Sequence, residues 1–438
     1  MLSPDTRLTD LAGPIVHSRL EPDFYKFTMG QLIWRKYREV DVSFTFHNRT
    51  AKARIGEVID VGELREQLAH ARSLMFTNSE LHYLRGTNEY QQRMFGEDYL
   101  EYLRQLRLPE FHVARNGPQL ELEFSGSWAD VTYWETIALS IVNETYYRTL
   151  LRRLSTFERH AVLAMGIRRL RDKILTLRGR PDIAFSDFGT RRRFSGPWQH
   201  YVDATLMAEL NGGSASGPFL GTSNTYAAMT TGLVPMGTAA HELPMVLAGV
   251  LDQGDDDPAW LRAAQRQVID DWWDQYGWGL SIFLPDTYGT DFFLNVVGPD
   301  DLRQWKGFRW DSGDMPAFID RIIRAYREAG IEPRDKMVVA SDALDLPVIL
   351  EAEEAFGNRI RMSYGWGTGL TNDLLDHVMI DGRWFGPMSL VIKPTRANGR
   401  GLVKLSDNPA KAVGIPDDVA RYKRAAEYAE REAIAVKY

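Results

Sequence analysis

Carboxylates follow three short apolar runs of the sequence in closely spaced pairs. These are Asp286 and Asp291, Asp311 and Asp314, and Asp342 and Asp345. Oxygen ligands of this type suit Mg²⁺, which keeps water molecules that can be exchanged for phosphate oxygens. The alternative is that each aspartate caps the helix that follows it, a position at which Asp is preferred. Asp286 and Asp342 are the candidate Mg²⁺ ligands.

Basic side chains occur where they could bind an anion. Arg191 begins a run of three arginines directly after an apolar segment, Arg309 closely follows another, and Lys393 and Lys404 lie further along the chain. A charge-assisted hydrogen bond to an anion is worth roughly 1.5–3 kcal/mol. Neighbouring side chains diverge, so only one or two of the three arginines can face one site. The alternative for the two lysines is a solvated strand edge.

A glycine-containing turn, Gly365-Trp-Gly-Thr-Gly369, ends another apolar run. Glycines let backbone N–H groups approach an anion closely, and the start of a following helix adds positive potential. Gly365, Gly367, Thr368 and Gly369 are therefore candidate phosphate-binding residues. An ordinary turn at the end of a strand is the alternative.

His241 is the candidate nucleophile. The chain has nine histidines, none in a metal-binding spacing such as HExxH, and it has no cysteine. Histidine is then among the few side chains that can act as a nucleophile at neutral pH. The neighbouring carboxylate of Glu242 could orient the imidazole. A structural histidine is the alternative.

Repeated strand and helix signals predict the elements that position these residues. Short apolar runs end in small polar clusters, and most are followed by a helix-like segment. This rhythm is typical of parallel βα units, whose polar tips all lie at the carboxyl ends of the strands. We therefore predict an α/β fold, an irregular TIM-like barrel from about residue 180 to 375. The runs are Ile183–Gly189, Phe219–Asn224, Val234–His241, Ile282–Asp291, Phe308–Asp314, Val338–Asp345 and Met362–Gly369.

The rest of the chain predicts a second, α+β domain. Residues 389–406 form a predicted hairpin, which the N-terminal segment would cover, and Asp417–Tyr438 form a predicted helix. Residues 1–135 together with 376–438 would make this domain, and residues 136–375 the barrel domain. Helices are also predicted over Asp60–Met75, Trp134–Leu154 and Glu158–Leu177 from their apolar periodicity and stop signals.

Composition narrows the class of protein. The chain has 438 residues and a formal net charge of −7. Its hydrophobic and charged contents are those of a folded, water-soluble protein. Without cysteine it can have no disulfide, thiolate zinc site or iron–sulfur cluster. The mild acidity argues against nucleic-acid binding. Neither a signal peptide nor a membrane-spanning run is visible, which predicts a cytoplasmic protein that does not bind membranes.

Taken together, the motifs resemble those of the nicotinate phosphoribosyltransferase family. The resemblance runs from Asp23 to about Pro409 and follows the order of the family's motifs. One departure is Glu21-Pro22, where many relatives have Thr-Asp or Asp-Thr. The matching segments are DFYKFTM, FSDFGTRRRFS, GTSN, PMGTAAHE, WDSGD, SDALD, GWGTGLTND and VKLSDNP.

The resemblance implies an activity in NAD salvage. The ring nitrogen of nicotinate attacks C1 of phosphoribosyl pyrophosphate, and pyrophosphate leaves with Mg²⁺. This forms a C–N bond and couples it to ATP hydrolysis through a phosphorylated histidine, which by its motif is His241. ATP and Mg²⁺ are thus the implied co-substrate and cofactor.

The same match implies roles for individual residues. Tyr25, from the neighbouring subunit of a homodimer, would stack on the pyridine ring opposite Phe188. Thr238 and Arg309 would hold the nicotinate carboxylate, Arg191 the substrate anions and Asp311 the ribose hydroxyls. The 5-phosphate would lie on Gly365, Gly367, Thr368 and Gly369, with Lys393 and Lys404 adding charge.

Substrate choice depends on Ser223 and Asn224. The related nicotinamide enzymes have an aspartate in this stretch, whereas the pair here is neutral. A carboxylate would repel nicotinate, so the pair favours the acid over the amide. Nicotinamide and quinolinate phosphoribosyltransferases are alternatives of the same fold, the latter releasing carbon dioxide without ATP. A barrel glycosidase would leave the arginines and glycines unexplained, and a non-catalytic nucleotide-binding protein is the alternative from another class.

Overall fold

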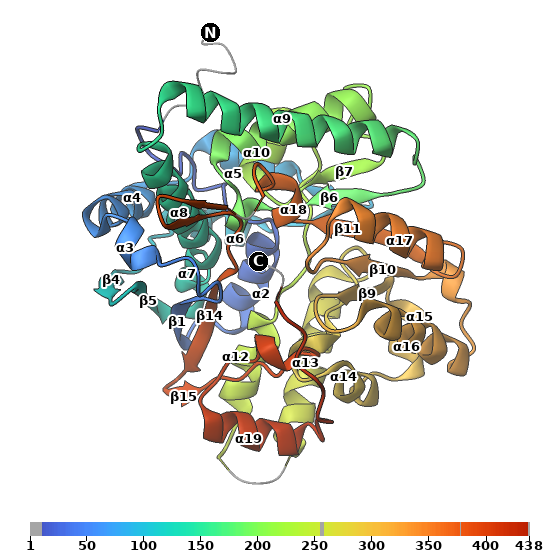
Figure 1. Cartoon of the computed structure of the whole chain (residues 1–438). Coiled ribbons are helices and arrows are strands. Elements are labelled where there is room, and N and C mark those ends of the chain that lie inside the picture. Colours follow the sequence, from blue (N-terminus) through green and yellow to red (C-terminus); the bar gives the residue numbers. More distant parts are fainter. Residues whose placement is uncertain (1–10, 255–257, 377, 437–438) are drawn as a thin grey trace.

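The computed structural model describes residues 11–254, 258–376 and 378–436 (Figure 1). The first ten residues, which bear on the prediction that no signal peptide is present, lie outside this range. Two sheets organise the described chain, one of six parallel strands and one of five antiparallel strands. The fold is thus mixed α/β, as predicted.

The parallel sheet has the strand order β7-β6-β11-β10-β9-β8. Six of the seven predicted runs form its strands. The exception is the run 234–241, which adds only an isolated bridge between Pro235 and Thr222. Proline lacks the N–H that a ladder needs, and Gly237 has a φ of +157°. The strands are β6 (Phe185–Asp187), β7 (Phe219–Thr222), β8 (Ile282–Phe283), β9 (Gly307–Trp310), β10 (Met337–Ala340) and β11 (Arg361–Trp366).

Closure of this sheet into a barrel is not confirmed. Strands β7 and β8 end the strand order, and no ladder joins them within the described ranges. In a closed TIM-like barrel the two end strands of the sheet pair with each other, so that the strands form a complete ring. The run 234–241, which was to supply one strand of that ring, instead follows an irregular path.

Helices follow most strands of the parallel sheet, as the βα rhythm predicts. Two of the tip aspartates are caps: Asp314 accepts the N–H of Ala317, and Asp345 accepts that of Val348. The capping interpretation is therefore correct for these two, while Asp286, Asp311 and Asp342 line or border a pocket. The helices are α10 (Gly196–Leu210), α11 (Thr225–Thr231), α12 (Glu242–Leu251), α13 (Ala259–Tyr276), α14 (Thr290–Val296), α15 (Pro299–Gln304), α16 (Met315–Glu328), α17 (Leu346–Phe356) and α18 (Thr368–Thr371).

The antiparallel sheet joins the two ends of the chain. Its order is β15-β14-β1-β5-β4, so the predicted C-terminal hairpin pairs with the N-terminal strand β1. A bulge between Ser43 and Phe44 shifts the register of that pairing. The division into a domain of residues 1–135 with 376–438 and a barrel domain of residues 136–375 stays a prediction. The strands are β1 (Asp41–Asn48), β4 (Phe111–Asn116), β5 (Gln119–Ser127), β14 (Leu390–Ala397) and β15 (Arg400–Gly401).

Capping residues explain where the predicted N-terminal helices begin. Asp60 accepts N–H groups at the start of α4, and Ser155 and Glu158 form a capping box for α9. These helices and α8 confirm the three predicted ones. In Figure 1, α9 crosses one end of the molecule and α8 packs beside the antiparallel sheet. The helices of this half are α2 (Tyr25–Lys36), α3 (Ile55–Val58), α4 (Val61–Ser73), α5 (Asn78–Gly86), α6 (Glu97–Gln105), α7 (Trp128–Val131), α8 (Trp134–Leu151) and α9 (Thr156–Arg178).

The predicted C-terminal helix is wrong over most of its length. Helix α19 spans only Pro416–Ala425. Glu427 has a φ of 51°, which a right-handed helix does not allow, and the described chain continues without regular structure to residue 436. The last two residues of the prediction lie outside the described range.

Length and hydropathy leave none of the described helices able to cross a membrane. Many large aromatic side chains are buried. On α13, Trp272 and Tyr276 are both buried, with ring centres 4.9 Å apart.

Candidate active site

Two adjoining cavities lie beside the parallel sheet. The first, of about 170 Å³, is the apolar pocket, and the second, of about 130 Å³, is the basic pocket. Both are lined by Phe188, Arg191 and Arg309, which therefore form their shared wall. The apolar pocket is defined by Tyr25, Leu220, Met236, Thr238, Leu280 and Ile282. The basic pocket is defined by Arg49, Arg192, Lys393, Lys404 and Lys411 together with His241.

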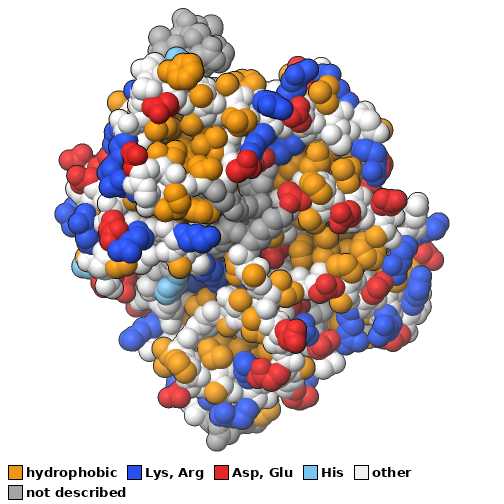
Figure 2. All heavy atoms as spheres, in the orientation of Figure 1, with side chains coloured by type: hydrophobic (Ala, Val, Ile, Leu, Met, Phe, Trp, Pro, Cys, Tyr) orange, Lys and Arg blue, Asp and Glu red, His pale blue; other side chains and the backbone are white. Residues whose placement is uncertain are grey.

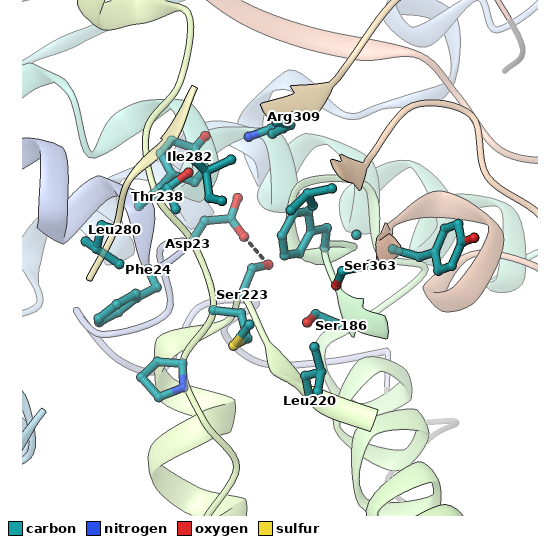
Figure 3. A pocket seen from close by; sticks show the side chains of 18 of the residues that line it. Asp23, Phe24, Ser186, Leu220, Ser223, Thr238, Leu280, Ile282, Arg309 and Ser363 are labelled. Carbon is teal, nitrogen blue, oxygen red and sulfur yellow. Dashed lines mark hydrogen bonds between the residues drawn. The ribbon is translucent and has the colours of Figure 1, made fainter. Parts of the chain in front are cut away.

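Figure 3 shows the apolar pocket, with Asp23 and Ser223 in contact at its wall. The Ser223 hydroxyl donates to Asp23 Oδ1 at 2.6 Å, and Arg191 Nε lies 3.3 Å from Oδ2. Burial raises the pKa of Asp23, although Arg191 and the hydroxyl oppose this. The sequence argument treated Ser223 and Asn224 as a neutral part of the site. It is incomplete, because Asp23, in the segment before α2, places its carboxyl group against Ser223.

Asn224 does not line either pocket. Its Oδ1 accepts the N–H of Ala227 and so caps α11, and its Nδ2 donates to Gln199 Oε1. The structure thus gives its buried side chain a role in positioning the helix after β7, and the predicted contact with substrate stays a prediction.

Tyr25 and Phe188 line the apolar pocket of the same chain. That Tyr25 stacks on the ring in the site of a neighbouring subunit stays a prediction, because the structure holds one chain and shows only that Tyr25 lines a pocket of that chain. The Tyr25 hydroxyl donates to Glu135 at 3.2 Å, and the Arg191 guanidinium carbon lies 5.7 Å from the tyrosine ring centre. The homodimer, which rested on the predicted contact between subunits, likewise stays a prediction.

The glycine turn divides between the two pockets. Gly365 lines the apolar pocket, whereas Gly367, Thr368 and Gly369 line the basic one. A Cβ at Gly365 would lie 2.3 Å from Cδ2 of Phe188, so only glycine lets that ring approach the strand. A Cβ at Gly369 would lie 2.4 Å from the backbone oxygen of residue 344. The candidate phosphate residues thus include one that shapes the apolar pocket.

Cations from remote segments meet in the basic pocket. Arg191 and Arg192 both line it, while Arg193 turns into the core and lies 2.9 Å from Glu21. Sequence reasoning missed Arg49 and Lys411, since neither follows a strand of the parallel sheet. On the face shown in Figure 2, basic and acidic side chains are interspersed. The basic pocket, by contrast, gathers seven lysine and arginine side chains in one cavity.

His241 lies at the wall of the basic pocket between hydroxyl, carboxylate and ammonium groups. Its Nδ1 is 3.0 Å from Thr287 Oγ1, and its Nε2 is 3.0 Å from both Asp311 Oδ2 and Lys404 Nζ. Burial lowers the pKa of His241 to about 4, with Lys404 also lowering it and the nearby carboxylates opposing. The imidazole is therefore neutral at pH 7, the form that can act as a nucleophile.

Glu242 does not orient the imidazole, contrary to expectation. Its carboxylate accepts from Trp128 Nε1 at 2.7 Å and Thr132 Oγ1 at 2.6 Å, and it also pairs with Lys26. Residue 242 begins α12, so its side chain points away from that of His241. Thr287 and Asp311 take the expected place beside the ring.

The carboxylates nearest His241 fit a divalent cation. One ligand atom from each of His241, Asp286 and Asp311 lies within 4.8 Å of the others. Asp286 Oδ1 is buried and has no hydrogen-bond donor among the described residues, so it is available to a ligand. Asp342 instead pairs with Lys411 at 2.5 Å. The two predicted Mg²⁺ ligands, Asp286 and Asp342, therefore do not lie in one cluster. The carboxylate that lies beside Asp286 is that of Asp311.

Arg309 connects the predicted ligands of the pyridine carboxylate and the ribose. Its Nη2 donates to Asp311 Oδ1 at 2.9 Å, and its Nε donates to Ser341 Oγ at 2.8 Å. These two hydrogen bonds hold the guanidinium group at the shared wall. Thr238 lines the apolar pocket near it. The cause of the low pKa of Asp311 is this arginine together with His241, which outweigh the opposing effect of burial.

The two pockets can hold a flat ring and a polyanion in contact, an arrangement suited to transferring a phosphorylated sugar to an aromatic base. Comparison with known proteins agrees. Residues 183–430 match the model of the nicotinate phosphoribosyltransferase family, and residues 20–143 match the model of its N-terminal domain. The chain is therefore a phosphoribosyltransferase, and it belongs to the nicotinate phosphoribosyltransferase family.

Solved structures support the same assignment. A nicotinate phosphoribosyltransferase from Vibrio cholerae is 29% identical, with a TM-score of 0.83 and 96% of each chain covered. One from Porphyromonas gingivalis is 26% identical, with a TM-score of 0.80, and the match covers 94% of this chain and 100% of that one. The likeness thus spans both sheets.

Proposed function

We propose that this chain transfers phosphoribose from phosphoribosyl pyrophosphate to nicotinate, with release of nicotinate mononucleotide and pyrophosphate. The observation that carries the proposal is the opening of an aromatic, largely apolar pocket onto a cation-lined one through Phe188, Arg191 and Arg309. A pyridine ring fits the first kind of site and a pyrophosphorylated sugar the second.

In this proposal the protein acts by positioning and by stabilising charge. Tyr25 and Phe188 hold the ring so that its nitrogen faces the basic pocket, while Arg309 and Thr238 hold the carboxylate. The nitrogen then forms a bond to C1 as the bond from C1 to pyrophosphate breaks. Lys393, Arg191 and the turn at Gly367–Gly369 hold the phosphates. Mg²⁺, held by Asp286 and Asp311, would supply positive charge to the leaving pyrophosphate.

ATP coupling is a second part of the proposal, with His241 as the phosphoryl acceptor. The neutral imidazole attacks the γ-phosphorus of ATP, the bond to ADP breaks, and water later removes the phosphoryl group. Nε2 faces Lys404, which can stabilise the transferred phosphate, whereas Nδ1 is held by Thr287. Phosphate on this ring would change the charge of the basic pocket and so bias substrate binding.

Preference for the acid over the amide is supported by Arg191 and Arg309 at the apolar pocket. Asp23 opposes it, but this carboxyl group is paired with Arg191 and Ser223. With Lys306, the apolar pocket has three cationic side chains against the carboxyl groups of Asp23 and Glu89, a balance that favours a negatively charged pyridine.

The test supplies phosphoribosyl pyrophosphate and Mg²⁺ with nicotinate, nicotinamide or quinolinate, each with and without ATP, and identifies the product by mass. Nicotinate mononucleotide that increases with ATP is expected. If product forms with nicotinamide but not with nicotinate, the chain has the activity of a nicotinamide phosphoribosyltransferase. If product forms with quinolinate and carbon dioxide is released, it has that of a quinolinate phosphoribosyltransferase. A chain that binds nucleotides but forms no product would overturn the enzymatic proposal.

A further inference from the structure

Glu135 is a buried carboxylate that contacts residues of both pockets without lining either. It lies in the first turn of α8, and its side chain is 1% exposed. Oε1 accepts from Lys393 Nζ at 2.9 Å, while Oε2 accepts from the Tyr25 hydroxyl at 3.2 Å and lies 2.7 Å from Lys26 Nζ. Arg191 Nη1 is 3.8 Å from Oε1.

The groups around Glu135 come from distant parts of the chain. Tyr25 and Lys26 belong to α2, Arg191 follows β6, and Lys393 is in β14 of the antiparallel sheet. Tyr25 lines the apolar pocket, Lys393 the basic pocket and Arg191 both. One carboxylate thus contacts the walls of both proposed substrate sites.

We infer that Glu135 is a positioning residue, which holds Lys393 and Arg191 at the phosphate-binding wall and Tyr25 at the ring-binding wall. The inference rests on the proposed function. Glu135 itself touches no substrate in this assignment; it acts by fixing the place and charge of groups that do.

Electrostatics explains why a carboxylate is needed at this point. Lys26, Lys393 and Arg191 would repel one another at such short range in a buried setting, and Glu135 is the anion that they share. Together these cations hold the pKa of Glu135 below its usual value, although burial opposes them. The carboxylate therefore stays ionised across the physiological range.

The charge of Lys393 depends on this carboxylate. The pKa of Lys393 is lowered to about 8, because burial, Arg191 and Lys404 all lower it and together outweigh Glu135, which raises it. Without Glu135 the pKa of Lys393 falls further, so the ammonium group loses its proton at a lower pH and with it a charge of the basic pocket. Removal of Glu135 should thus move the alkaline limit of substrate binding to lower pH.

Glu144 provides a matched control on the same helix. It is also buried, accepts from Arg148 Nη2 at 3.0 Å and from the backbone N–H of Gly196 at 2.9 Å, and lines neither pocket. Glu135→Gln and Glu144→Gln each remove one buried carboxylate of α8. Both variants should lose thermal stability, but only one should lose substrate binding.

The experiment compares the full-length variants with wild type in steady-state kinetics from pH 6 to 9. For Glu135→Gln we expect KM for phosphoribosyl pyrophosphate to rise about tenfold at pH 7.5, with its alkaline limb moved down by about one pH unit. Glu144→Gln should keep the wild-type KM and pH profile. Glu135→Asp, which keeps the charge on a shorter side chain, should give an intermediate KM and provides a second variant if Glu135→Gln does not fold.

Coupling to Lys393 gives an independent readout. The effects of Glu135→Gln and Lys393→Met on KM should be far from additive in the double variant, because both remove the same contact. Wild-type KM and pH profile in both Glu135→Gln and Glu135→Asp would overturn the inference. Lack of nicotinate-dependent product from wild type would instead overturn the proposed function.

Discussion

The two pockets differ in charge more than in size. In the described part of the chain, the basic pocket is lined by seven lysines and arginines against two aspartates, whereas the apolar pocket has three such cations against one aspartate and one glutamate. A chain with a net charge of −7 thus gathers positive charge at one internal site. Overall charge argued against a polyanion-binding surface, but it said nothing about a buried anion site.

The origin of the lining residues also differs. The apolar pocket is built mainly on the parallel sheet, with α2 closing one side. Three cations of the basic pocket, Arg49, Lys393 and Lys404, come from β14 or the segments that follow β1 and β15. The antiparallel sheet and the segments that follow its strands therefore supply positive charge to the basic pocket, whereas the apolar pocket belongs mainly to the parallel sheet.

The largest effect is expected from a substitution in the basic pocket that should abolish the proposed phosphoryl transfer and leave ring binding unchanged. His241→Asn should abolish both ATP stimulation and acid-labile protein phosphate, since His241 is the proposed phosphoryl acceptor. KM for nicotinate should change little, because His241 does not line the apolar pocket. Phosphate labelling with γ-labelled ATP and kinetics with and without ATP measure this. His112→Asn, an exposed histidine of β4, is the control, and ATP stimulation unchanged in His241→Asn would contradict the assignment.

Loss of a side chain from the shared wall should weaken the binding of both proposed substrates. Arg309→Met removes a guanidinium that lines both pockets, and one charge-assisted hydrogen bond is worth about 1.5–3 kcal/mol, or roughly 10- to 150-fold in KM. KM for nicotinate and KM for phosphoribosyl pyrophosphate should both rise within this range. Arg303→Met removes an exposed arginine paired with Asp300 and should leave both constants unchanged. An effect of Arg309→Met on one substrate alone would show that the wall is not shared.

A change at a residue that lines only the apolar pocket should affect the ring substrate more than the phosphoribosyl substrate. In Gly365→Ala the new Cβ would meet the Phe188 ring at 2.3 Å, so the ring must shift. We expect KM for nicotinate to rise about tenfold, the cost of a modest repacking. KM for phosphoribosyl pyrophosphate should rise less, because Gly365 lines only the apolar pocket although the displaced Phe188 ring lines both. Gly86→Ala, where a Cβ meets nothing within 4 Å, controls for the added methyl group. Equal effects on both substrates would argue against separate pockets.

The smallest effect is expected away from both pockets. Asp60→Ala removes the cap of α4, whose carboxylate accepts the N–H groups of Gly62 and Glu63. The free energy of unfolding should fall by about 1 kcal/mol, since this is the usual value of a helix cap. Chemical denaturation measures the change, and both KM values should equal those of wild type. A change in either constant would link α4 to the site.

Local patterns predicted much of the fold. Six strands of the parallel sheet and the helices α4, α8 and α9 follow from apolar runs, caps and stop signals, which depend on neighbouring residues. The failures were also local. Residues 234–241 have the composition of a strand, yet Pro235 and Gly237 prevent a ladder. The charged C-terminal segment ends its helix at Ala425.

Predicted site residues came together where they follow parallel strands. Phe188, Arg191, Arg309 and Asp311 all lie at carboxyl ends of such strands, which the sheet brings to one edge. Arg49 and Glu135 escaped prediction because nothing in their own neighbourhood marks them. Ser223 and Asn224 are adjacent in sequence, yet one faces the pocket and the other caps a helix.

By itself, the sequence determined the chemistry available to this protein: a histidine and no cysteine, glycine turns, and basic and acidic tips after a series of parallel strands. These features depend on residue type and short spacing, which no later folding step can change. Tertiary structure alone decided which groups share a site. It brought Asp23 against Ser223, placed Tyr25 in the pocket of its own chain, and gathered Lys393, Lys26 and Arg191 around Glu135. Such contacts join residues up to hundreds of positions apart, and only the packing of the two sheets sets them.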